Sequence, residues 1–157
     1  MERLASDLRQ QRITRKPFAL REFRGVNPED IDKLEAAGIK NIEQMIKVGK
    51  TPQSRQALVD KTGIPAEVIL EYVKLSDLAR IPGLKGIRAR LYYEAGADTV
   101  EKLAAWQPEP LFVMLADYVQ QSGFDGIAPL PIEVQHAVET ARKLPLVVEY
   151  EGWVGRV

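Results

Sequence analysis

Apolar side chains recur along most of the chain at the three- and four-residue spacing of α-helices. The clearest of these faces is formed by Val68, Ile69, Tyr72 and Val73. Two further faces combine Ile31, Leu34 and Ala37, and Leu111, Leu115, Tyr118 and Val119. Only residues 146–150 (LVVEY) are β-branched enough to predict a short strand or an extended tail. The pattern therefore predicts an all-α protein of about nine short helices.

Helix boundaries are marked by caps and glycines. Asn27 followed by Pro28 has the order of a cap and a first helical residue. Further starts are predicted at Asn41 and Asp98, each with a capping-box partner three residues later, and at Thr51-Pro52, Ile64-Pro65 and Ser76. Stops are predicted at Gly38, Gly49, Gly63 and Gly96. The glycine- and proline-rich segment 121–131 predicts a loop before a last helix near 132–144.

Two stretches of the chain repeat each other. Residues 23–46 read FRGVNPEDIDKLEAAGIKNIEQMI, and residues 81–104 read IPGLKGIRARLYYEAGADTVEKLA. Gly25 aligns with Gly83, and Gly38 aligns with Gly96. Each copy predicts a tight glycine turn, a helix, a second glycine turn and another helix, so the chain contains a duplicated structural unit.

The composition fits one domain or one tightly coupled pair. The 157 residues are 45% hydrophobic and include no cysteine. The missing cysteine excludes disulfides, thiolate nucleophiles and cysteine-based zinc sites, and favours a reducing cytoplasm. The longest apolar run, residues 111–116, is too short to cross a bilayer, and no signal-peptide core is present. We expect a basic arm at 1–21, a helical domain at 22–145 and an extended tail at 146–157.

Charge is balanced overall but unevenly distributed. Residues 1–21 contain six bases against two acids, whereas residues 106–157 contain three bases against seven acids. A basic arm suits contact with phosphate. It also suits a solvated helix, or a partner for the acidic end of the same or another chain, and the sequence leaves these interpretations open.

The turn at 83–86, Gly-Leu-Lys-Gly, is the strongest candidate for binding chemistry. Its glycines allow a sharp turn that leaves backbone N–H groups uncovered at the start of a helix, where the helix dipole favours anions. Lys85, Arg88 and Arg90 add positive charge nearby. This turn resembles the helix-hairpin-helix motif, whose family role is to hold the phosphate backbone of DNA without reading sequence. The candidate nucleic-acid-binding residues are Gly83, Lys85, Gly86, Arg88 and Arg90.

The other hairpins depart from this pattern. In the first copy, Pro28 replaces the second glycine and removes one N–H donor, and Glu29 and Asp30 repel phosphate. A looser relative at residues 63–66 contains Pro65 and is followed by Glu67. We expect the first hairpin to be structural, while the turn at 83–86 suits either a phosphate site or a plain tight turn.

The resemblance extends over residues 34–145. The segments LEAAGIKNIEQMI, TPQSRQALVDKTGIP, VILEYVKLSDLARIPGLKGIRARLYYEAGADTVEKLA and VQHAVETARKLP occur in this order. Together they resemble a bacterial domain family of unknown function built on tandem helix-hairpin-helix units. The resemblance implies a fold and carries no established biochemical activity.

Catalytic chemistry is hard to assemble from this sequence. The single histidine, His136, lacks a second histidine or a cysteine as a partner. The GLKG turn lacks the remaining residues of a nucleotide-binding fingerprint. Trp106 and the pair Tyr92-Tyr93 suit either base stacking or a core position. We therefore expect that the protein is not an enzyme and that it binds no cofactor and no metal.

Two functions remain open. The first is a non-enzymatic module that binds DNA or RNA backbone through residues 83–86. The alternative is a protein-interaction or scaffold module without nucleic-acid binding, which would self-associate or bind another protein through its apolar tail, where Trp153 is a candidate anchor. Neither function involves a membrane.

Overall fold

The computed structural model describes residues 17–151 of the chain. Over this range there are eight α-helices, one short 3-10 helix and no strand, which confirms the all-α prediction. The elements are η1 (Leu20–Glu22), α2 (Pro28–Ala36), α3 (Ile42–Gly49), α4 (Pro52–Thr62), α5 (Ala66–Leu78), α6 (Ile87–Ala95), α7 (Val100–Ala105), α8 (Pro108–Ser122) and α9 (Pro131–Lys143).

The duplicated sequence produces a duplicated backbone. Helices α2 and α3 form the first unit, and helices α6 and α7 form the second. Gly25 and Gly83 precede the two units with φ of +85° and +90°, and Gly38 and Gly96 join their helices with φ of +87° and +111°. Side chains with a Cβ rarely adopt these angles, so the same turn in each unit requires glycine.

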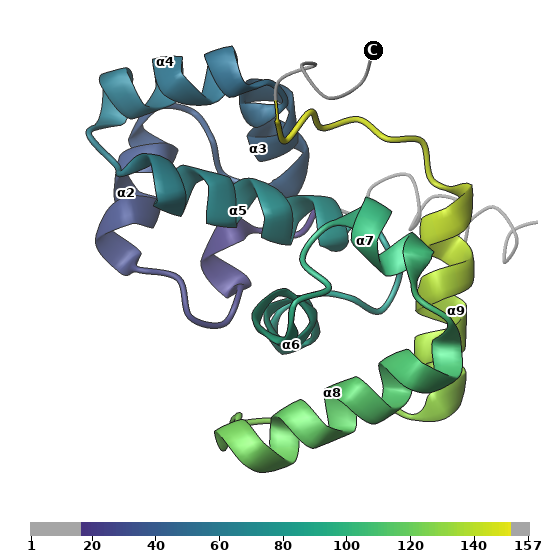
Figure 1. Cartoon of the computed structure of the whole chain (residues 1–157). Coiled ribbons are helices and arrows are strands. Elements are labelled where there is room, and N and C mark those ends of the chain that lie inside the picture. The colour runs from purple at the N-terminus through teal and green to yellow at the C-terminus, as the bar shows by residue number, and fades with distance from the viewer. Residues whose placement is uncertain (1–16, 152–157) are drawn as a thin grey trace, which may run out of the picture.

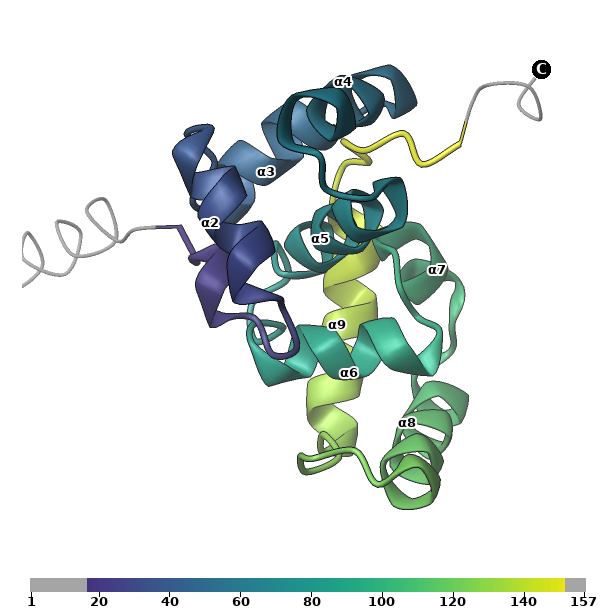
Figure 2. The same ribbon diagram turned by 90° about the vertical axis from the view of Figure 1, so that its left-hand side faces the viewer.

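Helix α5 lies at the centre of the molecule. It packs against α3 and α4 on one side and against α6 on the other, while α9 packs along α7 and α8 (Figures 1 and 2). Its fully buried apolar side chains include Ile69, Val73, Leu75 and Leu78. Since α5 connects the two units in sequence and packs between them, it fixes the second hairpin relative to the first.

Two predicted helix starts differ from the structure. Ser76 does not begin a helix: it lies inside α5, is fully buried, and its Oγ donates to the carbonyl of Tyr72 at 2.7 Å. Helix α7 is capped by Thr99, whose side chain accepts from the N–H of Lys102. Asp98, predicted as that cap, instead lies 2.7 Å from Lys74 Nζ, because an ion pair with α5 competes for its carboxylate.

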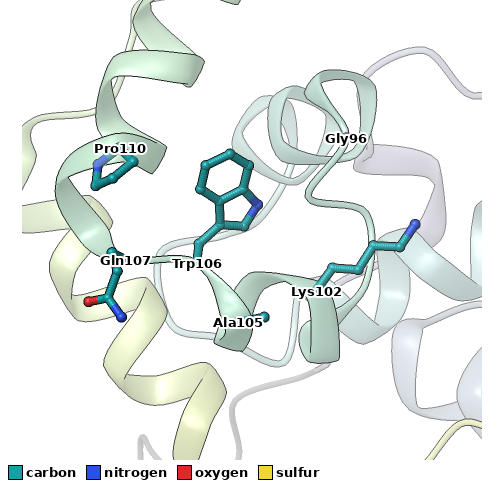
Figure 3. A pocket seen from close by; sticks show the side chains of 6 residues that line it. All are labelled: Gly96, Lys102, Ala105, Trp106, Gln107 and Pro110. Carbon is teal, nitrogen blue, oxygen red and sulfur yellow. The ribbon is translucent and has the colours of Figure 1, made fainter.

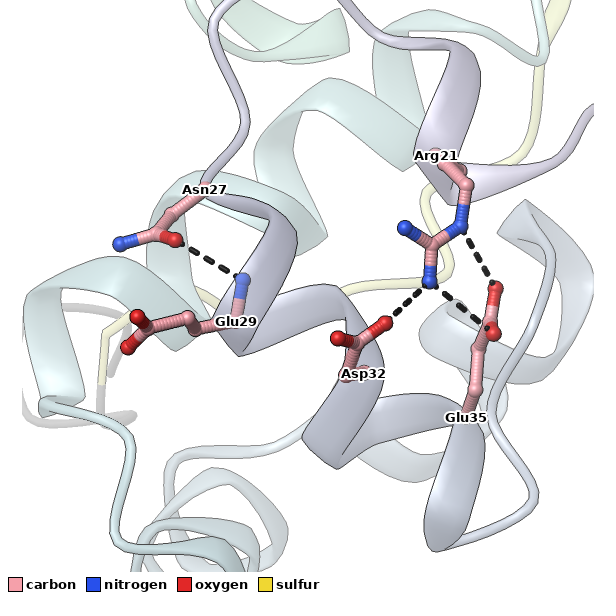
Figure 4. A network of polar contacts seen from close by, with 5 residues as sticks. All are labelled: Arg21, Asn27, Glu29, Asp32 and Glu35. Atoms are coloured by element: carbon pink, nitrogen blue, oxygen red, sulfur yellow. Dashed lines mark hydrogen bonds and ion pairs between the residues drawn. The ribbon is translucent and has the colours of Figure 1, made fainter.

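The chain on both sides of the domain packs against it where it is described. Residues 144–150 are extended and do not form a sheet; this segment runs from α9 back towards α3 and α4 (Figure 1). Arg21, the last base of the predicted arm, pairs with Asp32 at 2.6 Å and Glu35 at 3.1 Å on α2 (Figure 4). Residues 1–16 of the predicted arm, and Trp153, lie outside the described residues.

Candidate nucleic-acid interface

The second hairpin is built on one buried side chain and two glycines. Leu84 is 5% exposed and packs into the core, which anchors the turn between α5 and α6. Gly86, with φ of +57° and ψ of −120°, occupies a region that is open essentially to glycine alone. Gly83 and Lys85 on either side of Leu84 are exposed, so the turn faces solvent.

Three consecutive N–H groups of this hairpin have no acceptor within residues 17–151. They belong to Lys85, Gly86 and Ile87, and none of them donates to a backbone or side-chain atom there. All three lie at the N-terminal end of α6, where the helix dipole contributes a partial positive charge. Unpaired donors at such a position favour an anionic oxygen.

The surroundings leave one side of the hairpin open. A Cβ placed on Gly83 would meet no atom within 4 Å. A Cβ placed on Gly86 would lie 3.7 Å from the carbonyl oxygen of Glu22 and 3.9 Å from Phe18 Cζ, so the segment before α2 covers one side of Gly86. Among residues 17–151, therefore, no acidic side chain lies within 4 Å of the Cβ positions of these two glycines, and Gly83 is open.

Arg88 points from α6 to the loop before α9. Its Nη1 donates to the carbonyl of Ile127 at 3.2 Å, and its Nη2 lies 3.5 Å from Glu133 Oε1. The Arg88 side chain is 28% exposed, and the pair with Glu133 is long. Because an exposed ion pair of this kind contributes little free energy, Arg88 can exchange Glu133 for another anion at low cost.

Arg90 does not lie at the surface as a phosphate contact would require. Its side chain is 7% exposed; Nε donates to the carbonyl of Arg24 at 2.6 Å, and Nη2 lies 2.8 Å from Glu71 Oε2. Its guanidinium also lies over the Tyr93 ring, 5.4 Å from the centroid. The face of α6 that carries Arg90 packs against the first unit, so this residue joins the two units and is removed from the candidate contact set.

The first hairpin uses its equivalent donors internally. The N–H of Asn27 donates to the hydroxyl of Tyr72 at 3.1 Å, Pro28 has no N–H, and the N–H of Glu29 donates to Asn27 Oδ1 at 2.9 Å (Figure 4). A Cβ placed on Gly25 would lie 2.9 Å from Arg90 Nε, so this turn is covered. Its geometry agrees with the structural role predicted from the sequence.

The aromatic candidate Trp106 lies away from the second hairpin. Trp106 borders a hollow of about 430 Å³ together with Gly96, Lys102 and Pro110 (Figure 3). This hollow adjoins the C-terminal end of α6, about 13 Å along the helix from the hairpin. Tyr92 is buried, and His136 is exposed on α9.

Comparison with known proteins identifies a family and no activity. A family model described as "Domain of unknown function (DUF4332)" matches residues 24–144. The chain belongs to this family. The DUF4332 unit includes both hairpins and ends before the tail, and its match confirms the predicted resemblance to a family of unknown function. Neither a curated protein nor a solved structure matches the chain.

None of the helices between residues 17 and 151 combines the length and the apolar character that crossing a bilayer requires.

Proposed function

We propose that this protein is a non-enzymatic helix-hairpin-helix module that binds the phosphate backbone of nucleic acid without sequence preference, through the hairpin at 83–86. The observation that carries the proposal is the run of three N–H groups, from Lys85 to Ile87, without acceptors among residues 17–151. The first hairpin begins with a positive-φ glycine like the second, but its donors are used or missing. Open donors at only one of two related turns favour a ligand there.

Each hairpin residue has a distinct role in this proposal. Gly83 and Gly86 give the turn its shape, and the N–H groups of Lys85, Gly86 and Ile87 donate to phosphate oxygens. The exposed Lys85 ammonium adds a direct ionic contact. Arg88 contributes a second charge when it leaves Glu133. No base edge is read by these groups, so binding is independent of sequence.

A titration of a fluorescent mixed-sequence duplex tests this function. We expect binding that weakens steeply between about 50 and 200 mM salt, because most of its free energy comes from counterion release. Lys85→Glu should weaken binding about tenfold and lower the magnitude of the salt slope by about 1. Lys33→Glu, the same charge change on exposed α2, is the matched control and should retain affinity apart from a general electrostatic loss. Equal losses in both variants would contradict the proposal.

A protein-interaction role remains the second candidate. Ile127 is 84% exposed and Leu130 is 61% exposed, both on the loop that Arg88 holds beside the hairpin. Exposed apolar side chains gathered in this way favour a protein partner. If the duplex does not bind even at low salt, this candidate takes precedence. Ile127→Ser should then reduce self-association measured by light scattering.

The structure leaves few residues of the tail exposed for the predicted self-association. Residues 144–150 pack on their own chain over much of their length, and only Leu146 and Val147 are exposed among them as large apolar side chains. A change in mass after substitution of both residues by serine would support tail-mediated self-association, and an unchanged mass would exclude it for these positions.

A further inference from the structure

The tail is held to the domain by a socket for one tyrosine. The hydroxyl of Tyr150 donates to Asp77 Oδ2 at 2.6 Å, and the other carboxylate oxygen of Asp77 lies 2.7 Å from Arg80 Nη2. Arg55 Cζ and Lys74 Nζ lie 5.9 and 5.8 Å from the centroid of the Tyr150 ring. An acceptor for the hydroxyl and two cations over the ring make a site that is specific for tyrosine.

The rest of the tail is held through its backbone. Arg80 Nη2 donates to the carbonyl of Pro145 at 3.1 Å, and Arg55 Nη2 donates to the carbonyl of Tyr150 at 2.8 Å. The N–H of Glu149 donates to the carbonyl of Lys50 at 2.7 Å. Any extended segment offers the same carbonyl and N–H groups, so these backbone contacts require only that the bound segment be extended. The tyrosine socket is then the part of the site that distinguishes one side chain from another.

The tail leaves space beside it, and that space carries charges of both signs. A groove of about 710 Å³ runs between the tail and α7, and the charged side chains of the domain that line it are Lys50, Lys74, Lys102, Asp77 and Glu101. Lys74 and Lys102 already pair with Asp98, at 2.7 and 3.0 Å. The charge of the groove therefore does not select its occupant, which leaves selection to the tyrosine socket, and the open space can hold more side-chain volume than the tail supplies.

We propose that the surface beneath the tail is a peptide-binding groove for an extended segment of a partner protein that carries a tyrosine, with residues 145–151 as its built-in competitor. The residues that form the socket lie inside the DUF4332 unit, whereas the segment that fills it lies outside that unit. This groove is separate from the hairpin at 83–86. Its ligand is defined by the chemistry of the tail that occupies it.

A fluorescent peptide with the sequence of residues 144–151 (LPLVVEYE) tests the proposal on the full chain. Tyr150→Ala weakens the competitor while leaving the socket intact, so this variant should bind the peptide at least about tenfold more tightly than the wild type does. A peptide with phenylalanine in place of the tyrosine should bind about tenfold more weakly, because the bond to Asp77 is lost. Circular dichroism confirms that the variant is folded.

A second variant keeps the test decisive. Glu149→Pro retains Tyr150 but removes the N–H that donates to Lys50, and it should also increase peptide binding. If neither folded variant binds the peptide, the groove is not a peptide site. If the wild type binds the peptide as tightly as the variants do, or if the phenylalanine peptide binds equally well, the proposed competition or the tyrosine socket is wrong.

Discussion

The two hairpins share a positive-φ glycine, Gly25 in one and Gly83 in the other, and differ in what happens to their N–H donors. At positions aligned by the repeat, Asn27, Pro28 and Glu29 offer two donors, and both are used within the domain. Lys85, Gly86 and Ile87 offer three donors, none of which has an acceptor in the part of the chain that the structure describes. Duplication thus produced one turn closed by its neighbours and one turn left open. The difference lies in a few side chains and in the backbone at one aligned position, where Gly86 has φ of +57° and Pro28 is the first residue of α2.

Arginine substitutions give the largest expected effect. Arg90 closes the first hairpin, so Arg90→Met should lower the free energy of unfolding by about 3 kcal/mol, since Glu71 and the Arg24 carbonyl lose a buried partner. The matched variant Arg88→Met, two residues earlier and only loosely paired, should cost less than about 1 kcal/mol. Urea denaturation of the three proteins measures both values. Similar losses of unfolding free energy in Arg90→Met and Arg88→Met would show that Arg90 does not join the two units.

Glycine substitutions compare the turns directly. Gly25→Ala places a Cβ at a positive φ and 2.9 Å from Arg90 Nε, which is fixed by its bond to Arg24, so we expect a loss of about 2–3 kcal/mol. Gly83→Ala carries a similar backbone strain in open space and should cost about 1 kcal/mol. The thermal unfolding temperatures of the two variants show which substitution costs more stability. A larger cost for Gly83→Ala would contradict the assignment of open and closed turns.

Part of this contrast is predictable from sequence and part is not. The helical periodicity, the positive-φ glycines and the loss of a donor at Pro28 are local properties, so the all-α fold and the structural role of the first hairpin could be predicted. The burial of Arg90 depends on which face of α6 meets the first unit, and a basic residue near a glycine turn gives no local sign of that. The Tyr150–Asp77 contact joins residues 73 positions apart, so no local pattern indicates it.

A smaller effect is expected at Tyr92, which aligns with the buried Leu34. Its hydroxyl has no hydrogen-bond partner among the described residues, and burial raises the pKa of Tyr92 to about 12. Above pH about 10 the unfolded chain ionises this tyrosine while the folded chain does not. The contribution of Tyr92 to stability is therefore complete below pH 10 and should fall by about 1.4 kcal/mol per pH unit between about 10 and 12.

Tyr92→Phe provides the control for this pH dependence. The variant should lose the part of the decrease in unfolding free energy above pH about 10 that comes from Tyr92. At neutral pH its unfolding free energy should change by less than about 1 kcal/mol, because the lost hydroxyl had no partner among the described residues. Denaturation midpoints and tyrosinate absorbance followed across the same pH range report both quantities. Identical slopes for the two proteins would show that Tyr92 ionises freely in the folded state.

The most direct measurement follows the backbone amides of both hairpins by NMR while a short mixed-sequence duplex is added. The amide signals of Lys85, Gly86 and Ile87 should shift at low salt and return as salt is raised, whereas those of Asn27 and Glu29 should stay in place. Shifts of equal size at both hairpins, or binding that leaves the amides of Lys85, Gly86 and Ile87 unchanged, would contradict the claim that the open turn is the phosphate site.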